Sequence, residues 1–320
     1  MKTTPGIIAA VLATVLTSCF TGVEYTPKVT EKEVRHAKVT ERPETHYLDD
    51  VTAEPFAQWQ KGKRFTATDD RVIRLMGASG IGISSLSGKT LEYLGAQEAM
   101  SITSQPVAEL TFSTPEGEVA YRTDISLDSL RRRSTFEIPF LTDEARLQKL
   151  AAKLVGNTYF ITTPLWCNSE GVRVRGLKYV PVRVKAVTAG SGVYPVWLLL
   201  SYEVPQNAPA GDRDFKPGTT VEFKLPMSYD MTTGVARTFA DQFSLSDPRL
   251  NYPRITDSNW QRIERSRVGS GMTRDECRLA LGGPARVERV PGATTIYERW
   301  TYENGASLIF ADGILSSYRN

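Results

Sequence analysis

The segment "GSGMTRDECRLALGGPARVERV" (269–290), together with "YERWTYENGASLIFADGILSSYR" (297–319), decides the fold of the carboxy-terminal part of the chain. Thr273 is followed by two acidic residues within one turn, which is typical of a helix amino terminus, where a hydroxyl caps the backbone and carboxylates favour the helix dipole. Gly282 permits a left-handed stop, and Pro284 cannot continue a helix. We therefore predict a short helix that begins after Thr273 and ends before Gly282.

Strands are expected directly after this helix. Alternation of polar and apolar residues indicates four of them, at roughly 285–291, 295–303, 306–311 and 314–319. The "ENG" sequence between the second and third indicates a hairpin. On the second strand Trp300 and Tyr302 alternate with polar neighbours, so both rings are expected to face the helices.

A second helix is expected upstream of the first, within "RITDSNWQRIERSRV" (254–268). Its apolar residues, Trp260 among them, recur at helical spacing. Asp257 or Ser258 is the expected N-cap, and the glycines that follow the segment break the helix. The domain 251–320 is therefore expected to contain two short helices and an antiparallel sheet.

This order of elements resembles the SmpA/OmlA (BamE-like) family of outer-membrane lipoproteins over about 65 of the 320 residues. The matching structural residues are Gly271, Thr273, Gly282, Pro284, Trp300, Tyr302 and Phe310. The same plan also resembles the repeats of β-lactamase-inhibitor proteins, which bind protein surfaces. The resemblance implies an adaptor domain, although two extra modules precede it here.

The amino terminus has the features of an export signal. Lys2 precedes an apolar run, and the run ends in "LTSC" (16–19), which resembles a bacterial lipobox. We expect a lipoprotein signal peptide at 1–18 and acylation of Cys19, which would anchor the mature chain in a membrane. The alternative is an ordinary secretory peptide with a chance cysteine. Phe20 stands where lipoproteins held at the inner membrane commonly carry Asp, so we expect an outer-membrane, periplasm-facing location.

Residues 19–55 are polar and contain the near repeat "KVTEK" and "KVTER". Such a composition buries too little apolar surface to offset the entropy of ordering, so we expect a flexible tether behind the lipidated cysteine. An alternative is that its alternating Val and Thr residues pair with the sheet edge of a partner.

Two β modules are expected between the tether and the last domain. The first covers 56–135, and the second, with a linker helix, covers 136–250. The linker helix is expected to begin at Thr142 as N-cap and to end at Gly156. Both modules resemble SH3-like barrels in pattern. The fold class is therefore mainly β with an α+β part: two small SH3-like β-barrel modules, then a helix–helix–antiparallel-sheet domain.

The residues needed for common catalytic and metal sites are scarce. The two histidines, His36 and His46, both fall in the expected tether, whereas nucleophilic catalysis needs a rigidly held base. Cys167 and Cys277 lie far apart in the sequence, so we expect no metal site and no cofactor. These two cysteines either pair in an oxidising compartment or are buried thiols. A net charge of only +3 argues against nucleic acid as a partner.

We therefore expect a non-enzymatic envelope lipoprotein that serves as a protein-binding adaptor or scaffold in outer-membrane assembly or maintenance. Its expected partner is an envelope or outer-membrane protein. The alternative is a peptidoglycan-binding or cell-wall-modifying lipoprotein that uses its SH3-like modules. Outward positions on the last sheet are the expected binding residues: Arg286, Glu288, Arg299 and Thr301.

Overall fold

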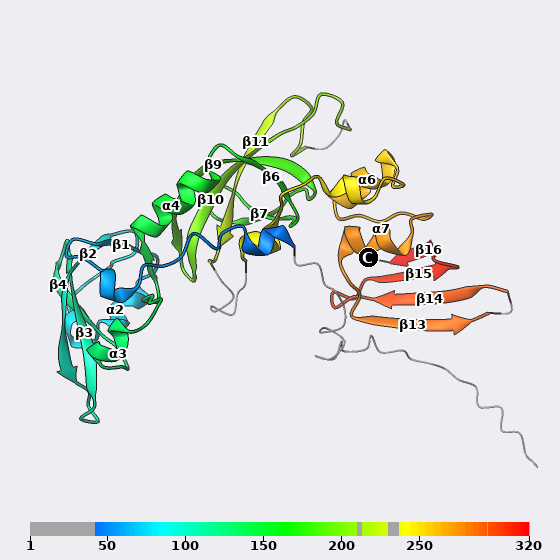
Figure 1. Cartoon of the computed structure of the whole chain (residues 1–320). Coiled ribbons are helices and arrows are strands. Elements are labelled where there is room, and N and C mark those ends of the chain that lie inside the picture. The colour runs from blue at the N-terminus through cyan, green and yellow to red at the C-terminus, as the bar shows by residue number, and fades with distance from the viewer. Residues whose placement is uncertain (1–41, 210–212, 230–236, 293, 320) are drawn as a thin grey trace, which may run out of the picture. The chain divides into compact units, whose positions relative to one another are not determined.

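The computed structural model describes residues 42–209, 213–229, 237–292 and 294–319. The chain is mainly β, with several sheets, one of which is curled into a half-barrel. It divides between Arg267 and Val268 into a larger and a smaller compact unit (Figure 1). Among the described helices, none has the length and apolar character needed to cross a membrane. The expected signal peptide and Cys19 lie outside the described residues.

The first sheet of the larger unit has five antiparallel strands in the order β4-β3-β2-β1-β5. Its core gathers aromatic rings, among them Trp59, Phe65 and Phe112. The elements of this part are η2 (Phe56–Gln58), β1 (Arg64–Ala67), α2 (Arg71–Leu75), η3 (Gly77–Gly80), β2 (Thr90–Met100), β3 (Pro106–Thr114), β4 (Gly117–Arg122), α3 (Leu127–Arg131) and β5 (Leu141–Asp143). Because β5 pairs with β1, the first sheet extends past the boundary predicted at residue 135.

The second sheet of the larger unit has seven strands in the order β12-β6-β9-β10-β11-β7-β8. Its core includes Trp166 stacked on Phe223, with ring centroids 3.6 Å apart. The elements are η1 (Pro43–His46), α4 (Glu144–Leu154), β6 (Thr158–Ile161), β7 (Leu165–Cys167), β8 (Arg173–Arg175), β9 (Val180–Ser191), β10 (Tyr194–Glu203), β11 (Thr220–Met227), α5 (Phe239–Gln242), β12 (Phe243–Ser244), η4 (Pro248–Asn251) and α6 (Asp257–Glu264).

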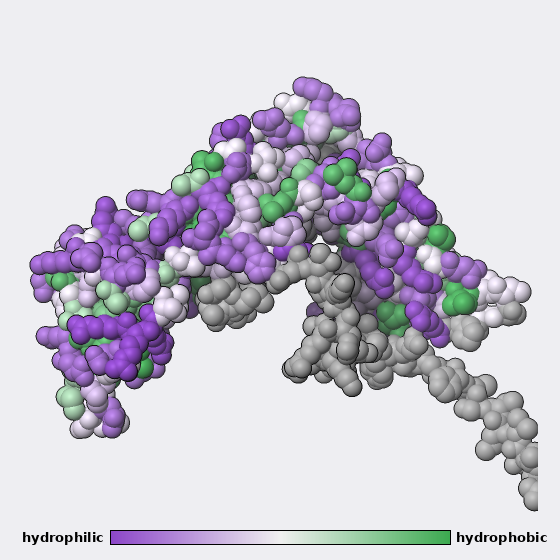
Figure 2. Space-filling model, in the orientation of Figure 1, coloured by the Kyte–Doolittle hydropathy of each residue, from purple (hydrophilic) through white to green (hydrophobic). Residues whose placement is uncertain are grey.

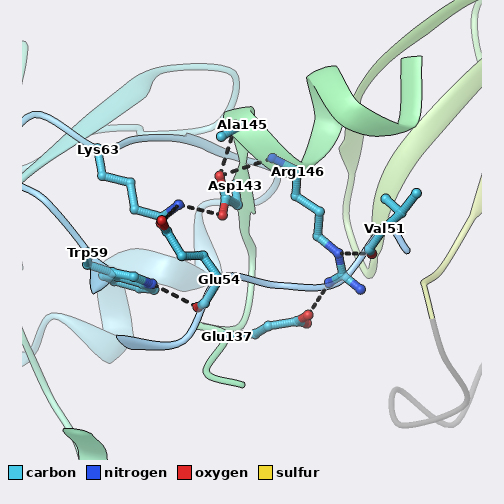
Figure 3. A network of polar contacts seen from close by, with 8 residues as sticks. All are labelled: Val51, Glu54, Trp59, Lys63, Glu137, Asp143, Ala145 and Arg146. Carbon is cyan, nitrogen blue, oxygen red and sulfur yellow. Dashed lines mark hydrogen bonds and ion pairs between the residues drawn. The ribbon is translucent and has the colours of Figure 1, made fainter. Parts of the chain in front are cut away.

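An ion-pair network around the buried Lys63 side chain holds the start of α4 (Figure 3). The Lys63 ammonium binds Asp143 at 2.7 Å and Glu54 at 2.9 Å, and the Lys63 side chain is only 7% exposed. The Asp143 carboxylate also accepts hydrogen bonds from the backbone of Ala145 and Arg146. Asp143 is therefore the N-cap of α4, whereas the hydroxyl of the predicted cap, Thr142, donates to the carbonyl of Pro195 at 2.8 Å.

Arg146 extends this network from the first turn of α4. Its Nε donates to the carbonyl of Val51 at 2.9 Å, and its guanidinium also binds Glu137 (Figure 3). The guanidinium carbon lies 3.6 Å from the ring centroid of Tyr229, a cation–π distance. One side chain thus connects α4 to the nearby Glu137 and to two segments that are distant in the sequence.

The tether prediction needs correction for residues 43–55, and its earlier part lies outside the described residues. Val51 is 3% exposed in the core of the second sheet, and Tyr47 packs against the same core. The Glu44 carboxylate accepts a hydrogen bond from the Leu245 backbone at 2.8 Å. A few apolar anchors in a polar segment suffice to order it, because each buries surface against a core that already exists.

The smaller unit contains α7 (Arg274–Leu281) and one four-stranded antiparallel sheet in the order β13-β14-β15-β16. The strands are β13 (Arg286–Pro291), β14 (Ile296–Thr301), β15 (Ser307–Ala311) and β16 (Ile314–Arg319). Thr273 caps α7 in a capping box with Glu276, whose carboxylate accepts from the Thr273 backbone at 2.6 Å. Gly271 has a φ of +88° and Gly282 a φ of +86°, values that favour glycine on either side of the helix.

The core of the smaller unit lies between α7 and one face of the sheet. The strands contribute three fully buried side chains to this core, those of Trp300, Leu308 and Phe310. The helix contributes the fully buried Cys277. Tyr302 also faces the helix, because its hydroxyl donates to the carbonyl of Gly282 at 3.3 Å. Pro284 follows the end of α7 and precedes β13.

The upstream helix differs from the sequence prediction in the unit to which it belongs and in its N-cap. Helix α6 belongs to the larger unit, so the division falls at Val268 instead of residue 251, and the N-cap of α6 is Thr256. The Lys178 backbone donates to the carbonyl of Glu264, which ties α6 to its own unit. Of the two states expected for the cysteines, the structure has the buried thiols, because Cys167 and Cys277 are both buried and free.

Candidate docking face of the four-stranded sheet

The four expected binding residues lie on one face of the carboxy-terminal sheet. Arg286 on β13 stands directly opposite Thr301 on β14, and Glu288 stands directly opposite Arg299. Directly opposite residues on antiparallel strands project to the same side of a sheet, and positions two apart share that side. The structure therefore brings all four together, on the face opposite Trp300.

Four further residues share this face and were missed in the sequence. Tyr297 lies two positions before Arg299 on β14. It stands opposite Ala311 on β15, and Ala311 stands opposite Ile314 on β16. Ile309 stands opposite Arg299 on the neighbouring strand. Tyr297 is 46% exposed and Ile314 is 44% exposed. The same two-residue alternation that identified Arg299 would have identified Tyr297.

The face is chemically mixed. Arg286 and Glu288 form an ion pair at 2.8 Å between side chains that are 56% and 30% exposed. Arg299 is exposed and lies two positions after the exposed Tyr297 on β14. On the side of the molecule in Figure 2, hydrophobic residues occur as separate spots among hydrophilic ones. A surface with an aromatic residue, an aliphatic residue and two arginines has the residue types that are common in protein–protein contacts.

The opposite face of β14 is held by a buried carboxylate. Glu298 is 2% exposed and accepts hydrogen bonds from the indole nitrogen of Trp300 and, at 3.1 Å, from Nε of Arg289. Arg274 on α7 adds an ion pair at 3.5 Å. The Arg278 guanidinium lies 4.8 Å from the Trp300 ring centroid. These contacts join α7, β13 and β14 behind the candidate face.

The charge of Glu298 is stabilised in the folded unit. Burial by itself would raise the pKa of Glu298, but the hydrogen bonds from Trp300 and Arg289 and the charges of Arg274 and Arg289 outweigh it. The pKa of Glu298 is therefore lowered from its ordinary value. These contacts fix β14 in the sheet, and a preformed surface loses less entropy on binding than a surface that must first become ordered.

Other residues considered from the sequence give no second site in the described part of the chain. His46 is exposed and its Nδ1 lies 2.7 Å from Asp49, whereas His36 is outside the described residues. Within the described residues, no group of three or more His, Cys, Asp or Glu side chains is placed to hold a metal ion. Comparison of the chain with protein families, with curated proteins and with solved structures gives no match.

Proposed function

We propose that this chain is a non-enzymatic lipoprotein of the bacterial outer membrane that acts as a protein-binding adaptor in outer-membrane assembly or maintenance. The proposal rests on the sheet of the smaller unit, in which a helix covers one face and the other face is exposed. Helix α7 packs on the face of Trp300, and the opposite face presents Arg286, Arg299 and Tyr297. Its partner is an envelope or outer-membrane protein.

Three sequence features support the location and the class. The lipobox-like "LTSC" (16–19) places the anchor at Cys19, and Phe20 favours the outer membrane. The last domain resembles the SmpA/OmlA family, and this resemblance supports assigning the chain to the class of envelope adaptors. The mixed charge of the docking face suits a contact of modest affinity, in which charge complementarity sets orientation and association rate more than total affinity.

The anchor is tested by replacing the acylated residue. In cells that produce the full chain, Cys19→Ala is expected to move the protein from the membrane fraction to the soluble periplasmic fraction, because no acyl chains remain to bury in lipid. The measurement is immunoblotting of both fractions, with Cys167→Ala as the control because that thiol is buried. Unchanged membrane association of Cys19→Ala would contradict the anchor.

Sedimentation with isolated cell-wall sacculi separates the adaptor from the alternative function. The purified full chain is expected to stay in the supernatant, since the proposal assigns its recognition surface to a protein partner. The measurement is the fraction of protein that pellets, read beside a known peptidoglycan-binding protein. Retention on the sacculi, or release of soluble muropeptides, would favour the cell-wall function and contradict the proposal.

A further inference from the structure

The larger unit contains a pocket of about 630 Å³. Its walls come from the ends of β9 and β10, from the chain after β10, and from η4 and α6, so segments far apart in the sequence meet there. Pockets that bind ligands commonly have volumes of about 300–1,000 Å³. All residues that line the pocket belong to the larger unit, so a binding function there is independent of the function proposed for the smaller unit.

The floor of the pocket is apolar and partly aromatic. Leu177, Val180 and Phe215 are buried in the core of the second sheet and also line the pocket. The rings of Phe160 and Tyr179 line it too, and both side chains are half-buried. Half-buried aromatic rings offer a face to an aliphatic chain or to a cation.

The polar lining is acidic. Four carboxylates and two guanidinium groups line the pocket, and they belong to Glu203, Asp247, Asp257, Glu264, Arg249 and Arg265. Four negative charges against two positive ones leave a formal charge of −2 when all six groups are ionised. Glu203 and Asp257 are exposed, and Asp247 is half-buried.

The buried part of this charge is already paired. Arg249 binds Glu264, whose side chain is 9% exposed, and the guanidinium of Arg249 lies 5.5 Å from the Trp260 ring centroid. Burial raises the pKa of Glu264, and the hydrogen bond from Arg249 opposes that shift. Because this pair is satisfied internally, the formal charge of −2 comes from the carboxylates of Glu203, Asp247 and Asp257 and the single guanidinium of Arg265.

We propose that this pocket binds a lysine or arginine side chain presented by an extended segment of a partner protein. Lysine and arginine combine an aliphatic stem with a cationic head, and the pocket combines an apolar floor with an excess of carboxylates. The half-buried rings of Phe160 and Tyr179 add favourable faces for the cation. The volume exceeds what a single side chain fills, so neighbouring peptide residues enter as well.

The test uses a fluorescent tetralysine peptide and the purified full chain at low ionic strength, where exposed charges are least screened. Fluorescence anisotropy is expected to show saturable binding of tetralysine and none of tetraglutamate. The variant Glu203→Gln/Asp257→Asn is expected to weaken tetralysine binding at least tenfold. Both substitutions keep the size of the side chain, and circular dichroism checks that the fold is unchanged.

A charge-matched control separates the pocket from a general effect of net charge. Glu118→Gln/Glu222→Gln removes two carboxylates from exposed strand positions that do not line the pocket, and it is expected to bind tetralysine as the parent does. Equal weakening by the two double variants would overturn the site. Equal displacement of tetralysine by spermidine, which has amines but no peptide, would overturn the assignment to a peptide segment.

Discussion

Trp300→Ala is expected to destabilise the smaller unit by roughly 3–5 kcal/mol, which is the usual cost of removing a buried aromatic side chain. Trp300 is fully buried, and its ring centroid is 4.7 Å from that of Phe310. The substitution also removes the hydrogen bond to the buried Glu298 carboxylate and the contact with Arg278. A unit of this size has little stability to spare, so the change is expected to unfold it.

Hydrogen exchange of the full chain, read by mass spectrometry, measures this effect unit by unit. Loss of protection in Trp300→Ala is expected within residues 268–319 and not within residues 42–267. The matched control is Tyr297→Ala, an aromatic deletion on the exposed face of the same strand, which is expected to leave protection near that of the parent. Parent-like protection in Trp300→Ala would show that the strand register of β14 is wrong.

Lys63→Met is expected to destabilise the larger unit by about 3 kcal/mol. The Lys63 ammonium is the counter-ion of Asp143, whose side chain is 14% exposed, and a buried charge left without its partner is costly. The ammonium also lies 5.6 Å from the ring centroids of Trp59 and Phe65, so the variant loses two cation–π contacts. Urea denaturation followed by far-ultraviolet circular dichroism measures the change.

Two further variants separate this mechanism from a general loss of charge. Arg132→Met breaks an ion pair whose side chains are 78% and 72% exposed, and it is expected to change the urea midpoint little. Lys63→Met/Asp143→Asn removes both charges while Asn still caps α4, so it is expected to recover part of the lost stability. A double variant as unstable as Lys63→Met would contradict the unpaired-charge mechanism.

The features of the smaller unit that could be predicted are those set by neighbouring residues. The helix stop at Gly282 needs only a local backbone conformation that glycine adopts easily, and its φ is +86°. The common face of Arg286, Thr301, Glu288 and Arg299 follows from two-residue alternation once the strands are aligned. Such local signals also placed the four strands close to their observed bounds.

Features that depend on distant contacts could not be predicted in the same way. The apolar stripe of α6, which includes Trp260, shows that the helix packs, but not that it packs in the larger unit. Thr142 and Asp143 are both competent caps, but the Thr142 hydroxyl donates to the distant carbonyl of Pro195, and Asp143 caps α4. The pocket joins Tyr179, Glu203 and Asp257 from separate segments, so no single stretch of sequence indicates it.

The proposed function requires that the chain docks a protein partner through the exposed face of its carboxy-terminal sheet. Photo-crosslinking in intact cells tests it, with a photoreactive amino acid in place of Arg299 and, separately, in place of Asp275. Both positions are exposed in the smaller unit, but Asp275 lies on α7. Mass spectrometry is expected to identify one envelope protein crosslinked from position 299 and absent from position 275. The same products from both positions, or no product from position 299, would contradict this docking site.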